Sequence, residues 1–241
     1  MKRLSFAEKD NLTTEELIEY FQELKEYYLS LPYDSEEIAK QEKQYQFVSS
    51  IARPIFRIIF NPLIVNPELL PKTEGNIFVS NHLTYVDQFL LGYTLGNRAA
   101  HFMASSQFKT MKRGGFYRFM GAVFVDRDDD NSKEQARILQ TQMVLNGSDV
   151  FIFPEGTRKP PYDVLKPFKL GAVTIAQETG APIIPMVINN TYKRNQLVAR
   201  ICSEPIYVQP TDDLKGVNQQ LWETIDEGIQ ENEKIYKYIR K

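Results

Sequence analysis

Residues 76–96 read NIFVSNHLTYVDQFLLGYTLG and combine the three features that determine the fold of this chain. The apolar run IFVS ends at Ser80 and has the length of a buried strand. NHLTY is polar enough to form a loop, and a helical pattern begins around Asp87. A strand that leads through a short loop into a helix is typical of α/β proteins.

The same alternation continues along the rest of the chain. Helices are predicted at residues 131–146 and 169–179, and each is followed by a glycine, which suits the left-handed backbone after a helix C-terminus. A last helix carries apolar residues from Leu214 to Ile229 at spacings of three and four. Strands are predicted at NIFVS, AHFMAS, AVFVD, DVFIF and PIIPMVI, with one or two more in LVARICSEPIYV. We therefore expect an α/β fold with a mixed, mostly parallel sheet flanked by helices.

A helical hairpin is expected before this sheet, in residues 1–65. Thr13 and Glu16 have the spacing of a capping box, LPYDSEE interrupts the helical pattern, and Asp34 can cap a second helix. We therefore divide the chain into this N-terminal segment, a possible membrane-interface element, and an α/β domain at residues 66–241.

The longest apolar stretch, FVSSIARPIFRIIFNPLIV, covers residues 47–65. Arg53, Arg57 and two prolines interrupt it, whereas a spanning helix needs about 20 predominantly apolar residues. We therefore expect no full transmembrane helix. Two interpretations stay open: the stretch lies in a membrane interface with its guanidinium groups toward lipid phosphates, or it packs on the core.

Charge and cysteine content exclude several classes of protein. The net charge of −2 and the pI near 5.8 provide no general basic field, so we expect no nucleic-acid partner and only a local anion site. The single cysteine, Cys202, cannot form an internal disulfide, and the N-terminus lacks a signal-peptide pattern. These features indicate a reducing, cytoplasmic setting, with Cys202 as a core residue.

The chain has two histidines, and His82 precedes Asp87 by five residues. In one continuous helix this spacing would place the two side chains about 140° apart, so they meet only if a turn lies between them. The predicted loop supplies such a turn. Asp87 can then accept the imidazole N–H and leave the other ring nitrogen to take a proton, as in a general base with its orienting partner. The alternative is that Asp87 only caps its helix and His82 is an ordinary loop residue.

Two further predicted strands end in polar residues. DVFIF leads into Glu155, Gly156, Thr157 and Arg158, and AVFVD leads into Arg127. Hydroxyl, backbone N–H and guanidinium groups suit a phosphate or a carboxylate, and the carboxyl ends of strands are where α/β sheets bind ligands. The alternative is ordinary turn chemistry with solvated charges.

Several motifs that would indicate other chemistry are absent. The acidic run at residues 126–130 lacks the glycine and the glutamate that a calcium loop needs at its sixth and twelfth positions, so no metal is predicted. The sequence also lacks GxSxG, a P-loop, GxGxxG and paired CxxC motifs.

Four stretches, NHLTYVD, GAVFVDR, FPEGTR and APIIPMVI, resemble in order and separation the motif blocks of the glycerolipid acyltransferases. The resemblance covers roughly residues 74–190 and is closest to the 1-acylglycerol-3-phosphate acyltransferases. It implies that His82, held by Asp87, deprotonates the sn-2 hydroxyl of lysophosphatidic acid, which then attacks the thioester of acyl-CoA or acyl-carrier protein. The product would be phosphatidic acid. Neither a cofactor nor an acyl-enzyme is implied, because a thioester is already activated.

The resemblance also suggests roles for the remaining site residues. Arg127 and Arg158, together with Gly156 and Thr157, would hold the phosphate of the acceptor, and Glu155 would organise their loop. Membrane lipid, lysophosphatidic acid and, as one donor, acyl-carrier protein are the expected partners, and the sequence indicates no oligomeric state.

The expected location is peripheral, on the cytoplasmic face of a membrane. The alternatives within the transferase interpretation are another lysophospholipid or lipid alcohol as the acceptor. Outside it, an acyl thioesterase or a non-catalytic lipid-binding protein stays open.

Overall fold

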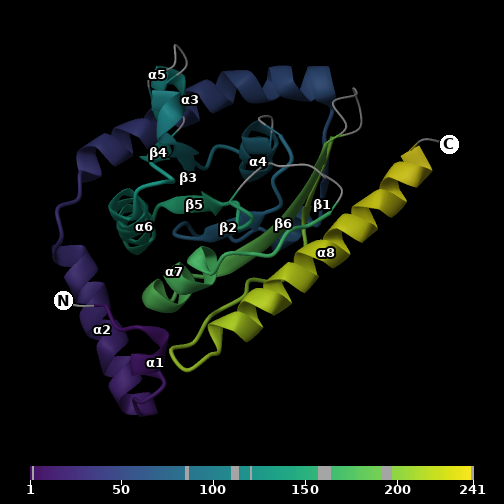
Figure 1. Cartoon of the computed structure of the whole chain (residues 1–241). Helices are drawn as coiled ribbons and strands as arrows, with labels where there is room; N and C mark the ends of the chain where they lie inside the picture. The colour runs from purple at the N-terminus through teal and green to yellow at the C-terminus, as the bar shows by residue number, and fades with distance from the viewer. Residues whose placement is uncertain are drawn as a thin grey trace.

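The computed structural model describes residue 1 and residues 3–84, 87–109, 114–119, 121–156, 164–190 and 197–239. Its centre is a seven-stranded sheet in the order β1-β7-β6-β2-β5-β3-β4 (Figure 1). The five strands from β6 to β4 are mutually parallel, whereas β7 is antiparallel to β6 and parallel to β1. The predicted mixed, mostly parallel sheet is therefore confirmed.

Helices and strands alternate along the chain as the hydrophobic pattern predicts. The strands are β1 (Leu63–Val65), β2 (Ile77–Ser80), β3 (Ala100–Ser105), β4 (Ala122–Val125), β5 (Asp149–Ile152), β6 (Ile183–Asn190) and β7 (Leu197–Ile201). The α-helices are α1 (Phe6–Lys9), α2 (Thr14–Ser30), α3 (Ser35–Phe60), α4 (Asp87–Leu95), α5 (Gly114–Phe119), α6 (Asp130–Leu145), α7 (Gly171–Thr179) and α8 (Leu214–Ile239). Short 3₁₀ turns are η1 (Pro67–Leu69) and η2 (Ser106–Lys109).

Helices cover both faces of the sheet, so both faces are apolar. Along β2, Ile77 and Val79 pack under α6, α7 and α8, whereas Phe78 between them packs on the side of α4. The three side chains are fully buried. Burial on both faces explains why the central strands read as continuous apolar runs. At the end of α7, Gly180 adopts the left-handed conformation (φ 74°) that its position in the sequence predicts.

Helices α2 and α3 begin where the capping residues predict. Thr13 and Glu16 form a reciprocal capping box at α2, and Asp34 accepts the backbone N–H of Glu37 at the start of α3. The helices then diverge: α2 packs on α6 and α7, and α3 crosses over α4 and α5 (Figure 1). The last residues of the predicted segment, Leu63–Val65, form strand β1 of the sheet.

A buried ionic cluster joins α2 to the helices beneath it. Glu178 of α7 is fully buried, its Oε2 lies 2.5 Å from Arg137 Nη1, and its Oε1 lies 2.7 Å from Arg3 Nε. The hydroxyl of Tyr28 donates a hydrogen bond to the same carboxylate, and burial raises the pKa of Tyr28 to about 12. The N-terminal segment is thus fastened by buried charges as well as by apolar contacts.

Helix α3 is two-sided: one side packs on α4 and α5, as the core interpretation of residues 47–65 predicts, and the other side is exposed. The membrane-interface interpretation stays a prediction. Arg53 lies over the ring of Tyr93 in α4, 5.4 Å from its centroid, rather than turning outward, while Arg57 is exposed. Five apolar side chains on the outer side form what we term the α3 row, with 49% to 71% of each exposed. The row consists of Phe47, Ile51, Ile55, Ile58 and Ile59. Within the described ranges, none of the helices combines the length and apolarity needed to cross a membrane.

Candidate active site

The candidate site lies at the edge of the sheet where β2 and β5 end. The two strands are neighbours and run in parallel, so the residues that follow them emerge side by side. His82 follows β2 by two positions, and Glu155 follows β5 by three. The structure therefore brings two of the predicted stretches together.

His82 and Asp87 form a hydrogen-bonded pair across the predicted turn. His82 Nδ1 lies 2.8 Å from Asp87 Oδ2, and the side chains are 10% and 1% exposed, respectively. A carboxylate can only accept at this position, so Nδ1 carries the proton and Nε2 is the basic nitrogen. This is the geometry of a general base with its orienting partner.

The Asp87 carboxylate is held by the loop that precedes α4. Its Oδ2 also accepts the backbone N–H groups of Leu83 at 2.6 Å and Thr84 at 2.8 Å, and its Oδ1 accepts the Thr84 hydroxyl at 3.0 Å. Asp87 therefore holds the turn and the imidazole at the same time, which a simple helix cap would not do.

We expect Asp87→Asn to fold normally and to keep part of the acyl transfer that the sequence resemblance implies. The amide oxygen can take the place of Oδ2 for the three N–H donors, and the NH₂ group can donate to Thr84 Oγ1. The ring of His82 thus stays oriented, but its positive charge loses the carboxylate. The check is kcat together with thermal unfolding, and a large loss of stability in Asp87→Asn would contradict this arrangement.

Glu155 is engaged by backbone from two segments. One oxygen accepts the backbone N–H of His82 at 3.0 Å, and the other accepts that of Lys166 at 3.2 Å. The residue is only 8% exposed. Its carboxylate thus fastens the loop after β2 to the loop before α7, which is an organising position rather than that of a group turned toward solvent.

Sequence reasoning missed two residues that fix His82. Phe153 stacks on the imidazole ring, and Asn81 bonds to both backbone groups of Ile188 in β6, at 2.8 and 2.9 Å. Only their positions in the sequence could have pointed to them: Asn81 directly precedes His82, and Phe153 directly precedes the PEG turn. What they contact depends on strand pairing and is not readable from either stretch alone.

The structure describes only some of the residues that the sequence predicts to bind an anion. Thr157 and Arg158 lie outside the described residues. Arg127 follows β4 and is exposed, and within the described part of the chain no hydrogen bond or ion pair engages its guanidinium group. Three strand spacings separate β4 from β2, or roughly 14 Å at about 4.8 Å each. Arg127 therefore flanks His82 at a distance.

Lys169 is a further cation at this edge that sequence reasoning did not select. Gly156 has a left-handed backbone (φ 67°), and a methyl group at its Cα would lie 2.9 Å from Lys169 Nζ. The backbone N–H of Lys169 donates to Pro154 O at 2.9 Å. The glycine thus permits an ammonium group to lie directly against the PEG turn.

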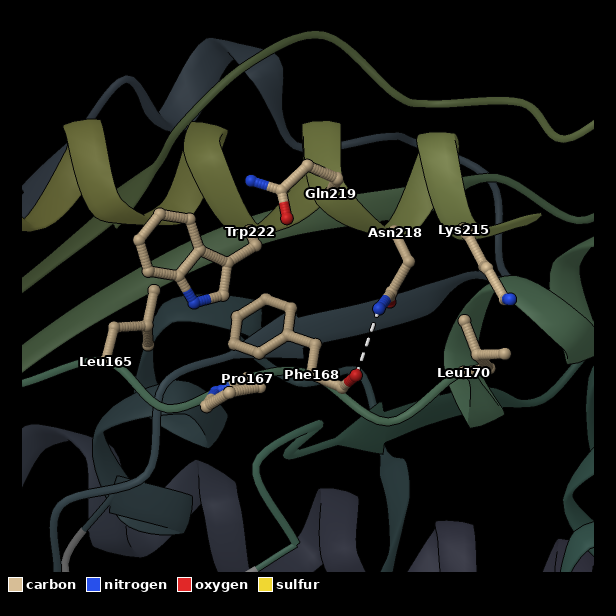
Figure 2. A pocket seen from close by; sticks show the side chains of 8 residues that line it. All are labelled: Leu165, Pro167, Phe168, Leu170, Lys215, Asn218, Gln219 and Trp222. Carbon is tan, nitrogen blue, oxygen red and sulfur yellow. Dashed lines mark hydrogen bonds between the residues drawn. The ribbon is translucent and has the colours of Figure 1, made fainter. Parts of the chain in front are cut away.

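The loop before α7 is also held from the other side, by α8. Trp222 donates its indole N–H to Lys166 O at 3.1 Å. Asn218 donates to Phe168 O at 3.0 Å (Figure 2). A groove of about 500 Å³ separates the loop from the helix. It is lined by Leu165, Pro167, Phe168, Leu170, Lys215, Asn218, Gln219 and Trp222 (Figure 2).

Cys202 lies away from this edge, in the layer beneath α8. A methyl group at Gly228 would come within 2.7 Å of its sulfur, and burial raises the pKa of the thiol to about 12. A thiol held in its protonated form is a poor nucleophile. Cys202 is therefore a packing residue, as expected.

With this fold and this histidine–carboxylate pair established, comparison with known proteins identifies the family. The acyltransferase family model matches residues 62–189, and this chain belongs to that family. It is 30% identical to the 1-acyl-sn-glycerol-3-phosphate acyltransferase of Bacillus subtilis over 68% of this chain and 82% of that protein. It is 35% identical to a chloroplastic 1-acyl-sn-glycerol-3-phosphate acyltransferase of Brassica napus over 52% of this chain, a match that covers only 36% of the length of that protein.

A solved structure shows the same fold. The crystal structure of the 1-acyl-sn-glycerophosphate acyltransferase from Thermotoga maritima superposes with a TM-score of 0.59 and covers 90% of this chain and 95% of that one. The sequences are 22% identical, so this likeness concerns the fold alone.

Proposed function

We propose that this chain transfers a fatty acyl group from acyl-CoA or acyl-carrier protein to the sn-2 hydroxyl of 1-acylglycerol-3-phosphate, giving phosphatidic acid. The observation that carries the proposal is the contact of 2.8 Å between His82 Nδ1 and Asp87 Oδ2 at the carboxyl end of β2. The names of the relatives support the choice of acceptor.

In this mechanism, Nε2 of His82 takes the proton of the sn-2 hydroxyl while the hydroxyl oxygen attacks the carbonyl carbon of the thioester. The tetrahedral intermediate then collapses, the C–S bond breaks, and the departing thiolate takes the proton from the imidazolium. Asp87 stabilises the positive charge of the ring between the two steps. The acyl group passes directly from donor to acceptor.

Labelled acyl-CoA and acyl-carrier protein, each with and without lysophosphatidic acid, test this function. Label that moves to phosphatidic acid only when the acceptor is present supports the proposal. Hydrolysis without an acceptor would indicate a thioesterase, and neither reaction would indicate a lipid-binding protein. Replacing the acceptor by other lysophospholipids tests the headgroup.

Arg127→Ala is expected to raise the KM for lysophosphatidic acid by roughly tenfold to a hundredfold, because a charge-assisted hydrogen bond contributes about 1.5 to 3 kcal/mol. The KM for the acyl donor should change little, since the phosphate is remote from the reacting carbonyl. Arg127→Lys should recover part of the loss, because lysine keeps the charge but lacks the planar fork.

Arg118→Ala is the matched control for Arg127→Ala. Arg118 is also exposed, but it precedes β4 and so lies at the opposite edge of the sheet. Steady-state kinetics with each substrate varied in turn would separate the two variants. An unchanged acceptor KM in Arg127→Ala would remove this residue from the phosphate site.

We further propose that the protein binds peripherally to the cytoplasmic face of a membrane through the α3 row. The acceptor and the product are lipids, and an exposed apolar row on a helix suits the interface between headgroups and acyl chains. Helix α3 leads into β1, which runs antiparallel to β2. The C-terminal end of the row is therefore near the sheet edge that carries His82.

A further inference from the structure

The aromatic ring of Phe153 covers one face of the His82 imidazole. The ring centroids lie 4.0 Å apart and the planes differ by 20°, so the rings are stacked almost in parallel. Phe153 is partly buried and packs on the apolar cluster under α4. A phenyl ring has no proton to exchange, so any part that Phe153 takes in the reaction must act through the imidazole.

The stack adds a constraint to the hydrogen bonds that His82 makes with Asp87 and Glu155. The hydrogen bond to Asp87 fixes the position of Nδ1, and Glu155 holds the backbone N–H of His82. These two hydrogen bonds alone would let the imidazole tilt about Nδ1, and such a tilt would change the direction in which the lone pair of Nε2 points. A parallel aromatic ring at van der Waals distance opposes the tilt. Tilting would separate the two rings at one edge of the imidazole and make them clash at the opposite edge.

Phe153 is itself well anchored. Pro154 restricts the backbone that follows it, and Pro154 O accepts the N–H of Lys169 at 2.9 Å. Glu155, two positions later, binds His82 and Lys166. One short segment after β5 therefore holds both the backbone and the ring plane of His82.

We propose that Phe153 is a positioning residue, which holds the His82 ring in the plane that directs Nε2 at the acceptor hydroxyl and shields one ring face from water. This rests on the proposed acyl transfer, in which Nε2 takes the proton. Misplacement of a reacting group by about 1 Å can lower a rate by about a hundredfold. Losing the stack should therefore lower kcat and leave both KM values little changed.

Phe153→Leu should lower kcat by roughly tenfold to a hundredfold, and Phe153→Tyr, which keeps a ring at this position, should retain most of it. Phe151→Leu is the matched control. Phe151 lies two positions earlier in β5, is 5% exposed, and packs against Phe78 with a centroid separation of 5.3 Å. The Phe151→Leu variant should unfold at a lower temperature than the wild-type protein and keep its kcat. An unchanged kcat in Phe153→Leu, or an equal loss of kcat in Phe151→Leu, would overturn the proposal.

Proton NMR of the histidine rings gives a readout that does not depend on acyl transfer. The chain has two histidines, and buried His101 serves as an internal reference. The ring current of Phe153 should shift the ring protons of His82 upfield, and Phe153→Leu should reverse this shift without moving the signals of His101. His82 signals that stay in place would overturn the proposal. If the wild-type protein shows no acceptor-dependent transfer, the proposed function fails, while the NMR result still decides whether Phe153 orients the ring.

Discussion

His82→Ala is expected to abolish acceptor-dependent acyl transfer and to leave the fold intact. A general base contributes about a hundredfold to ten-thousandfold to a rate, and in the proposed mechanism His82 also returns the proton to the leaving thiolate. The side chain lies in a loop and is 10% exposed, so its removal creates little cavity in the core. Asp87 would keep its hydrogen bonds from Leu83 and Thr84, which preserve the turn.

The other histidine provides the control for this variant. His101 is 1% exposed in β3, with Nδ1 3.2 Å from Gly121 O and Nε2 3.4 Å from Glu42 Oε1. His101→Gln should therefore destabilise the protein and keep transfer, the reverse of His82→Ala. Kinetics and thermal unfolding of both variants make the comparison. A folded His82→Ala protein with near-normal turnover would contradict the proposed mechanism.

The α/β fold was predictable because its signals are local. Strand β2 is buried on both faces, so its residues 77–79 form an uninterrupted apolar run. Gly180 marks the end of its helix through a backbone conformation that other residues adopt at a cost. The packing of α3 was less accessible. Its Arg53 lies over Tyr93, which is 40 positions further along the chain. The periodicity of residues 47–65 does not indicate this contact.

The candidate site was predictable where the contacting residues are close together in the sequence. His82 and Asp87 meet across one turn, so their spacing and the predicted loop sufficed. The partners of Glu155 and Phe153 depend on the pairing of β2 with β5, which a single sequence does not specify. Sequence reasoning therefore selected the pair of residues to which the proposed mechanism assigns the chemistry, and it selected Glu155 as an organising residue without its partners. It missed Phe153 and Asn81.

Replacing Ile51, Ile55 and Ile58 together by glutamate is expected to abolish binding to anionic vesicles. These side chains are 55%, 52% and 71% exposed, so about half of each remains to be buried in a membrane interface. Burying half an isoleucine contributes on the order of 1 kcal/mol, and three such losses amount to at least a hundredfold in partitioning. Three carboxylates would add repulsion from anionic lipid and a desolvation cost.

Vesicle co-sedimentation and transfer to vesicle-borne lysophosphatidic acid provide the measurements for this variant. Transfer should fall with vesicle binding and recover when the acceptor is a short-chain analogue dispersed in water, because the site around His82 is unchanged. The matched control is Ile18→Glu with Leu29→Glu, two side chains on α2 that are 44% and 53% exposed and lie outside the α3 row. Equal binding by the triple variant and the wild-type protein would show that the row is not the membrane contact. An equal loss in the α2 control would mean that added negative charge, rather than the loss of this apolar surface, releases the protein from the vesicle.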